Sequence, residues 1–133
     1  MASNLHTSIA AAQAQAAALA ALANGGFIDL YATAQPSTPE TAAGGTALVT
    51  FALPATFAAS VTGGVITAAA ITAATIANSG TALWYRVTES DHATPLWDGS
   101  VGVAGCDMNL TSVALSAGAT LSLSSLTYTV PGV

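Results

Sequence analysis

The chain has 133 residues, the length of one domain, and charged residues make up 5% of it, against about 25% in a typical soluble domain. Six acids and one base, Arg86, give a formal net charge of −5. A nucleic-acid binder needs a basic patch, and a disulfide scaffold needs paired cysteines, whereas this chain has one Arg and the single Cys106. The hydrophobic content of 53% excludes a disordered chain. The composition therefore describes a folded domain with unusually few charges.

The uncharged, Ala-rich start of the chain predicts neither a signal peptide nor a membrane span. A signal peptide has Lys or Arg before a strongly apolar core, but Asn4, His6 and Gln13 interrupt this stretch. Ala is also too weak a hydrophobe for a spanning helix, which needs about 20 mostly apolar residues. The longer uncharged stretch 41–85 is broken by Pro54 and by glycines. We expect a soluble protein that has no membrane partner and is not exported by a cleaved signal.

Residues 4–24 are predicted to form a helix, because Ala, the best helix former, dominates them. Ser3 or Asn4 is the expected N-cap, and Asn24-Gly25-Gly26 supplies a stop. Steps of three and four residues make one narrow apolar stripe, formed by Leu5, Ile9, Ala12, Ala16, Leu19 and Ala23. This stripe packs either on the protein's own sheet or on a neighbouring subunit. We divide the chain into an N-terminal helix that serves as an arm or anchor, residues 1–25, and a β-sandwich domain, residues 26–133.

After Gly26 the apolar period changes from 3.6 to 2, which indicates strands. The segment 61–77 fits helix or strand, but its many Thr and Ile residues favour strand, with a turn or bulge at Gly63-Gly64. Turns are expected at Asp98-Gly99 and near residues 104 and 117. Short strands with turn signals between them predict a mostly β fold, an antiparallel sandwich or jelly roll preceded by one helix. The other expected strands are 27–31, 46–53, 81–89, 96–97, 100–103, 108–115 and 120–130.

No cluster of polar residues fits a catalytic or metal-binding pattern. Ser90-Asp91-His92 contains the residue types of a catalytic triad, but triad geometry comes from residues distant in sequence, so a solvated turn is expected. The segment 98–102 is close to a nucleophile elbow, yet a strand and not a helix follows it. Cys106 has no partner at metal-ligand spacing. We expect a protein that is not an enzyme, with no catalytic residue, metal or cofactor.

Arg86 lies two residues from Trp84 on a predicted strand, in place for a cation–π contact. Pairing with one of the six acids is the other structural interpretation. Arg and Trp are also enriched at interface hot spots, so an interface anchor stays open. The candidate interface residues are therefore the helix stripe and these side chains: Leu5, Ile9, Ala12, Ala16, Leu19, Trp84, Arg86 and Trp97.

The second half of the chain resembles a family of small structural proteins from tailed bacteriophages. Its blocks are GTALWYRV at 80–87, WDGSVG at 97–102, DMNL at 107–110 and GATLSL at 118–123. The first half joins through NGGFIDLY at 24–31 and QPSTP at 35–39, so the resemblance covers about residues 24–131. The chain departs from this pattern at Cys106, where a small residue such as Ala is usual, and in its Ala-rich first helix.

The resemblance implies a virion protein, made in the cytoplasm of the bacterial host and placed on the capsid surface. It implies a cement or decoration protein that binds the lattice of the major capsid protein as a dimer or trimer and stabilises the assembled head. A subunit with so few charges suits burial against neighbours. A tail or baseplate component, structural or receptor-binding, is the alternative. A small hydrolase acting on host wall polymers is a third hypothesis that the residues do not favour.

Overall fold

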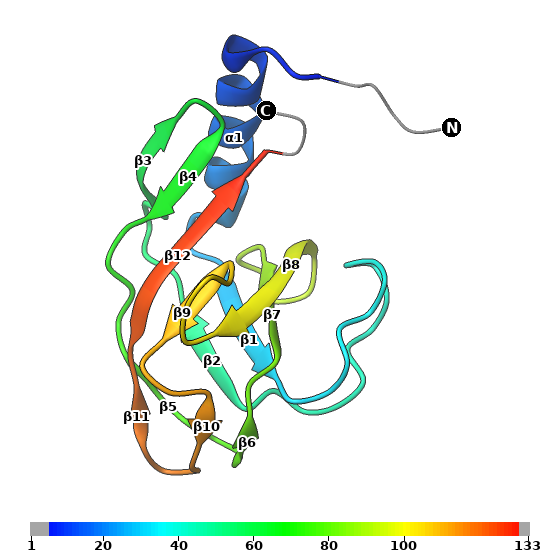
Figure 1. Ribbon diagram of the computed structural model, residues 1–133, viewed down its shortest axis with the longest axis vertical. Helices are drawn as coiled ribbons and strands as arrows, with labels where there is room; N and C mark the ends of the chain where they lie inside the picture. The colour runs from blue at the N-terminus through cyan, green and yellow to red at the C-terminus, as the bar shows by residue number, and fades with distance from the viewer. Residues whose placement is uncertain (1–5, 131–133) are drawn as a thin grey trace.

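In the computed structural model, residues 6–130 are described, apart from the side chains at positions 124 and 125. One helix, α1 (Ile9–Ala23), precedes a set of short strands (Figure 1). The strands are β1 (Phe27–Tyr31), β2 (Val49–Ala52), β3 (Ala58–Thr62), β4 (Val65–Ala68), β5 (Ala74–Thr75), β6 (Gly80–Thr81), β7 (Trp84–Thr88), β8 (Pro95–Gly102), β9 (Met108–Leu110), β10 (Ala114–Leu115), β11 (Thr120–Leu121) and β12 (Leu123–Thr129). The expected mostly β fold with one N-terminal helix is confirmed.

Eight strands form one curled sheet in the order β2-β1-β7-β8-β9-β12-β4-β3. Every neighbouring pair is antiparallel except β8 and β9, which run parallel, so the wholly antiparallel expectation is wrong at this pair. Two short pairs, β10 with β6 and β11 with β5, lie at the end of the molecule away from the helix (Figure 1). Because β5 also contacts β2, these short strands help to close the curl around a single apolar core.

The helix begins later than predicted. Ser8 is its N-cap, with an extended backbone and a side-chain oxygen that accepts a hydrogen bond from the N–H of Ala11. The expected N-caps, Ser3 and Asn4, lie outside the described residues. The predicted stop is correct, since Gly25 takes a φ of +68° directly after the Asn24 cap.

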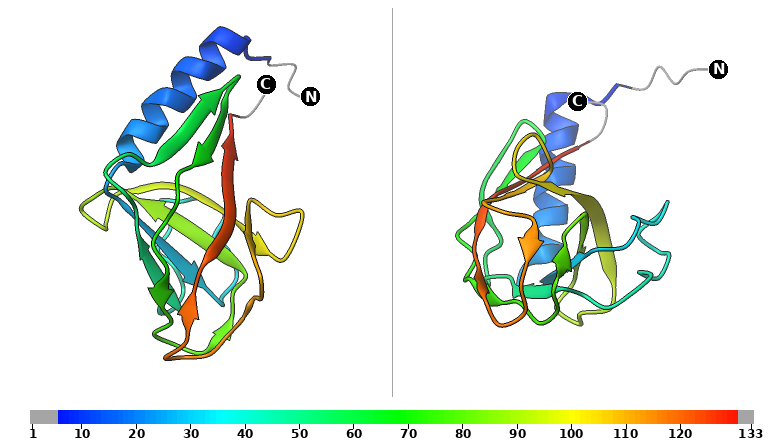
Figure 2. Two further views of the ribbon diagram at one scale, coloured as in Figure 1. Left: turned by 90° about the vertical axis from the view of Figure 1, so that its left-hand side faces the viewer. Right: turned by 60° about the horizontal axis from the view of Figure 1, so that its bottom comes forward.

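The helix packs on its own chain, against β3, β4 and β8 (Figure 2). The predicted stripe faces this contact from Ala12 onward: Ala12, Ala16 and Ala23 are buried in the same core as the strands, with Leu19 packed beside them, whereas Ile9 is exposed. Gln13 adds a tie, because its side-chain amide donates to the carbonyl of Val61 at 2.6 Å. The apolar stripe of the helix therefore packs on the protein's own sheet, the first of the two interpretations, and α1 shares a core with residues 26–130.

The ambiguous segment 61–77 contains strands, as its Thr and Ile content favoured. Gly63 and Gly64, with φ of +59° and +85°, form the tight turn of the β3–β4 hairpin. The turn expected at Asp98-Gly99 is absent, because residues 95–102 form one continuous strand, β8. Gly99 was predicted as a turn residue, whereas in the structure it leaves room for the aromatic ring of Tyr85.

Candidate functional site

A row of polar side chains crosses four neighbouring strands on the face of the sheet opposite the core. Thr50, Asp29, Arg86 and Asp98 pair in register from β2 through β1 and β7 to β8. Arg86 donates from Nε and Nη2 to the two carboxylate oxygens of Asp98, at 2.7 and 3.0 Å. The hydroxyl of Thr50 donates to Oδ1 of Asp29. Cross-strand pairing thus aligns two hydrogen-bonded pairs, Thr50–Asp29 and Arg86–Asp98, in one row across four strands.

His92 bonds to the other oxygen of Asp29, with 2.8 Å between Nε2 and Oδ2, and its ring stacks on Phe27. The adjacent Asp91 instead bonds within its own turn, to the backbone N–H groups of Ala93 and Thr94 and to the Thr94 hydroxyl. These bonds, the Thr94 hydroxyl above all, lower the pKa of Asp91 to about 2. Asp91 and His92 therefore bond to different partners and not to each other, and among the described residues no Ser or Thr hydroxyl bonds to the His92 ring.

Both structural interpretations of Arg86 hold together. Its guanidinium carbon lies 5.2 Å from the centre of the Trp84 ring while its nitrogens hold Asp98. Hydrogen bonding to Asp98 raises the pKa of Arg86, so the group stays charged although it is buried. Trp84 in turn stacks on Tyr31, with ring centres 4.6 Å apart. Trp84 Nε1 is buried and has no hydrogen-bond partner among the described residues.

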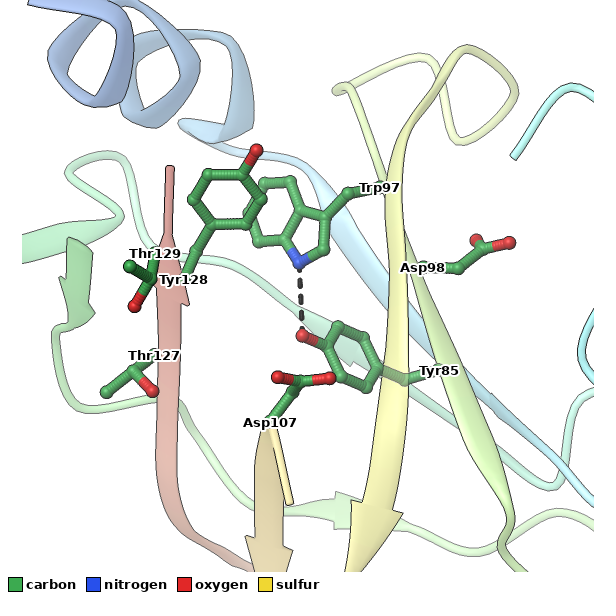
Figure 3. Close-up of a pocket in the computed structure, with 7 residues that line it drawn as sticks. All are labelled: Tyr85, Trp97, Asp98, Asp107, Thr127, Tyr128 and Thr129. Atoms are coloured by element: carbon green, nitrogen blue, oxygen red, sulfur yellow. Dashed lines mark hydrogen bonds between the residues drawn. The ribbon is translucent and has the colours of Figure 1, made fainter. Parts of the chain in front are cut away.

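A pocket of about 170 Å³ opens on the opposite side of the sheet, where β8 and β12 diverge above the start of β9 (Figure 3). The rings of Trp97 and Tyr128 pack against each other at its wall, with centres 5.0 Å apart and planes inclined by 55°. The hydroxyl of Tyr85 and the carboxylate of Asp107 line it further in Figure 3. The lining also includes Asp98, Thr127 and Thr129, whose side chains point away in that view.

The ring of Tyr85 reaches this pocket because it lies over Gly99, its partner across β7 and β8. A Cβ atom at position 99 would lie 2.4 Å from atoms of that ring, so a side chain there would displace it. With the ring in place, the Tyr85 oxygen accepts a 3.0 Å hydrogen bond from Nε1 of Trp97. Burial raises the pKa of Tyr85, so the phenol is neutral and keeps a proton to donate.

Asp107 supplies the one full charge whose side chain faces into this pocket. Its Oδ2 accepts hydrogen bonds from the backbone N–H and the hydroxyl of Ser100, at 3.0 and 3.1 Å. These two bonds fix the carboxylate, while Oδ1 has no hydrogen-bond partner among the described side chains and backbone groups. The chain's one Lys or Arg is already bonded to Asp98 on the other face of the sheet. The pocket therefore combines aromatic rings, a neutral phenol and, at its solvent-exposed edge, a carboxylate that pairs with no basic side chain among the described residues.

The candidate interface residues are placed mostly inside the protein. Ala12, Ala16, Trp84, Arg86 and Trp97 are buried, and Leu19 is half-buried. Ile9 is 72% exposed, at the first turn of α1, and Leu5 lies outside the described residues. In this arrangement only Ile9 offers a partner a large side-chain surface, and an interface role for the others stays a prediction.

The sequence reasoning singled out Trp97 but missed Tyr85, Asp107 and Tyr128 as its neighbours. The alternation in β7 puts Tyr85 on the inner face, which was a usable signal. The meeting of β8, β9 and β12 was not readable, because the parallel β8–β9 pair joins only two residues of each strand.

Within the described part of the chain, no cluster of three or more His, Cys, Asp or Glu side chains is arranged to hold a metal ion. The same residues contain no helix that is long and apolar enough to span a membrane. Comparisons with protein-family models, curated proteins and solved structures found no match to this chain.

Proposed function

We propose that this protein is a structural component of a bacteriophage virion, a capsid cement or decoration protein that binds the assembled head lattice. The sequence blocks between residues 24 and 131 support a phage structural protein, and the β-rich domain with its docked helix is compatible with that family. On the particle the protein forms a dimer or trimer and contacts the major capsid protein. Its action is energetic: binding the assembled lattice but not loose subunits shifts the equilibrium towards the intact shell.

The observation that carries the proposal is the outward face of α1. This face bears no charged side chain, and Gln15 is its one polar residue; the others are Ile9, Ala10, Ala11, Ala14, Ala17, Ala18, Ala21 and Leu22. A surface helix normally has a charged or polar outer face, and a helix that is apolar all round is usually buried. The small Ala side chains would let another backbone approach closely. An outer face of this kind is suited to burial against a neighbouring subunit.

The test uses phage heads that lack the protein and measures how much purified protein they retain. Ala18→Arg places a charge at the centre of the outward helix face, where a docked neighbour would leave it unpaired. We expect this variant to bind heads about tenfold or more weakly than the wild type, because a buried unpaired charge is costly. Ala117→Arg makes the same change at an exposed position between β10 and β11, at the far end of the molecule, and should bind normally (Figure 1).

Two outcomes contradict the proposal at different levels. Equal occupancy by Ala18→Arg and the wild type would remove α1 as the contact face. Failure of the wild-type protein to bind heads would reject the cement function itself. Copy number then separates the alternative: a number set by the head lattice supports the capsid, and a few copies per particle support a tail or baseplate component.

A further inference from the structure

The pocket between β8, β9 and β12 is bordered by a carboxylate, that of Asp107, which forms no ion pair with a described residue. Asp107 is held by Ser100 through one carboxylate oxygen, which leaves the other oxygen available. The Tyr85 oxygen accepts a hydrogen bond from the indole N–H of Trp97, and the phenol is neutral, so it adds no charge to the pocket. The rings of Trp97 and Tyr128 contribute aromatic faces, which carry negative quadrupole potential. The groups that point into the pocket thus favour positive charge.

Within the part of the chain that the structure describes, neither Arg86 nor His92 neutralises this pocket. Arg86 is held by Asp98 on the opposite face, and His92 is bonded to Asp29 there. The formal net charge of −5 adds to the same sign. Anionic ligands such as phosphate or a carboxylate are therefore disfavoured, because they would meet the Asp107 carboxylate in a pocket whose described lining includes no basic side chain.

Size narrows the ligand further. A volume of about 170 Å³ equals about six waters at about 30 Å³ each, below the 300–1,000 Å³ typical of drug-sized ligand sites. A single small group fits, with its charged end at a carboxylate and its stem against the rings. Primary ammonium groups on alkyl stems have this form, since they donate to carboxylates and bind aromatic faces by cation–π attraction.

We propose that this pocket binds a primary alkylammonium group, with Asp107 as its counter-ion and the Trp97 and Tyr128 rings against its stem. The chemistry is shared by a lysine side chain of a protein partner and by a free polyamine. This site is separate from the outward face of α1, so it stands or falls independently of the cement function.

The experiment is an NMR titration of the intact, ¹⁵N-labelled protein with n-butylammonium chloride at constant ionic strength. The two tryptophans give separate indole N–H signals: Trp97 lines the pocket, whereas Trp84 lies on the other face of the sheet and serves as an internal control. We expect the Trp97 signal and the backbone amides of 127–129 to shift with saturation while the Trp84 signal stays in place. Neutral n-butanol of the same length and glucose should leave all of them unchanged.

Two variants test the assignment of the groups. Asp107→Asn removes the charge but keeps an oxygen that can accept from Ser100. Because Asp107 is solvent-exposed, the variant should weaken butylammonium binding about threefold. Glu40→Gln changes the net charge equally at an exposed loop position and should leave the affinity unchanged. Tyr128→Leu keeps an apolar side chain but removes the ring, and should weaken binding about threefold. It also tests the site if Asp107→Asn does not fold.

The outcomes separate cleanly. Three results would overturn the proposal. An equal response to butanol would mean an apolar site, and a response to glucose alone would mean a site for neutral hydroxyl ligands. Undiminished binding by Asp107→Asn would mean that Asp107 is not the counter-ion. If butylammonium binds as expected, a blocked tripeptide with a central Lys and the polyamine spermidine are compared. Tighter binding of the peptide supports a protein partner, and tighter binding of spermidine supports a free polyamine.

Discussion

Removing Asp98 should destabilise the protein strongly, because it strands the buried guanidinium of Arg86. The two side chains are 4% and 9% exposed, and two hydrogen bonds of 2.7 and 3.0 Å join them. Removing one partner of a buried ion pair costs about 3–5 kcal/mol, since water cannot replace the lost carboxylate. A domain of this length has a total stability of about 7–20 kcal/mol at 0.05–0.15 kcal/mol per residue. Asp98→Ala should therefore remove a large part of the free energy of unfolding.

Urea unfolding followed by circular dichroism measures this loss. The midpoint for Asp98→Ala should fall while the slope of free energy against urea stays that of the wild type, because the same surface is exposed on unfolding. The double variant Arg86→Met with Asp98→Leu removes both charges and leaves none unpaired. Its cost should be well below that of Asp98→Ala alone, since apolar residues often replace a buried pair without loss.

Two results would refute this reasoning. A loss below about 1 kcal/mol for Asp98→Ala is the range of solvent-exposed pairs, and it would mean that water reaches Arg86. A double variant whose cost equals the sum of Arg86→Met and Asp98→Leu measured singly would mean that the two side chains do not interact.

Three further outcomes follow from the structure. Gly99→Ala should cost about 1–3 kcal/mol in urea unfolding, because the new Cβ lies 2.4 Å from the Tyr85 ring, whereas Gly44→Ala, with nothing within 4 Å, should cost less than about 0.5 kcal/mol. Burial raises the pKa of Tyr85, so above pH 10 the unfolded chain loses the phenol proton before the folded one, and the urea midpoint should fall as the pH rises further. Tyr85→Phe should make this fall smaller, and the same fall in Tyr85→Phe and the wild type would contradict the burial. The carboxyl ¹³C signal of Asp91 should titrate at about pH 2, so the contribution of this carboxylate to stability is complete above pH 3.8 and is lost as the pH falls towards 2. Thr94→Ala should raise the titration midpoint, and a wild-type midpoint near 3.8 would show that the turn does not form.

Local chemistry made much of the fold predictable. Ala content placed the helix, the glycine pair after Asn24 ended it, and Gly63-Gly64 marked a hairpin turn. Alternation in 84–88 predicted opposite faces correctly, although both faces of β7 turned out to be buried. Each of these features depends on residues within a few positions of one another, so the sequence carries the signal directly.

Tertiary contacts decided what the sequence could not. Gly99 looked like a turn residue because a glycine after Asp is a common turn signal, but it lies in a strand where Tyr85 needs the space above it. The helix start was misplaced because several residues between 3 and 8 have side chains suited to an N-cap, and in the structure Ser8 takes that role. The pocket depends on the register of three strands that are distant in sequence.

The few charges of this chain are used for internal bonds. Four of its six acidic side chains, those of Asp29, Asp91, Asp98 and Asp107, accept hydrogen bonds from other residues of the protein. The only Arg is held in the same way. None of these charges lies on the outward face of α1, which apart from Gln15 consists of Ala residues, Ile9 and Leu22. The neutral helix face and the pocket that Asp107 borders are therefore two separate surfaces of different chemistry, one suited to apolar packing and the other to a cation.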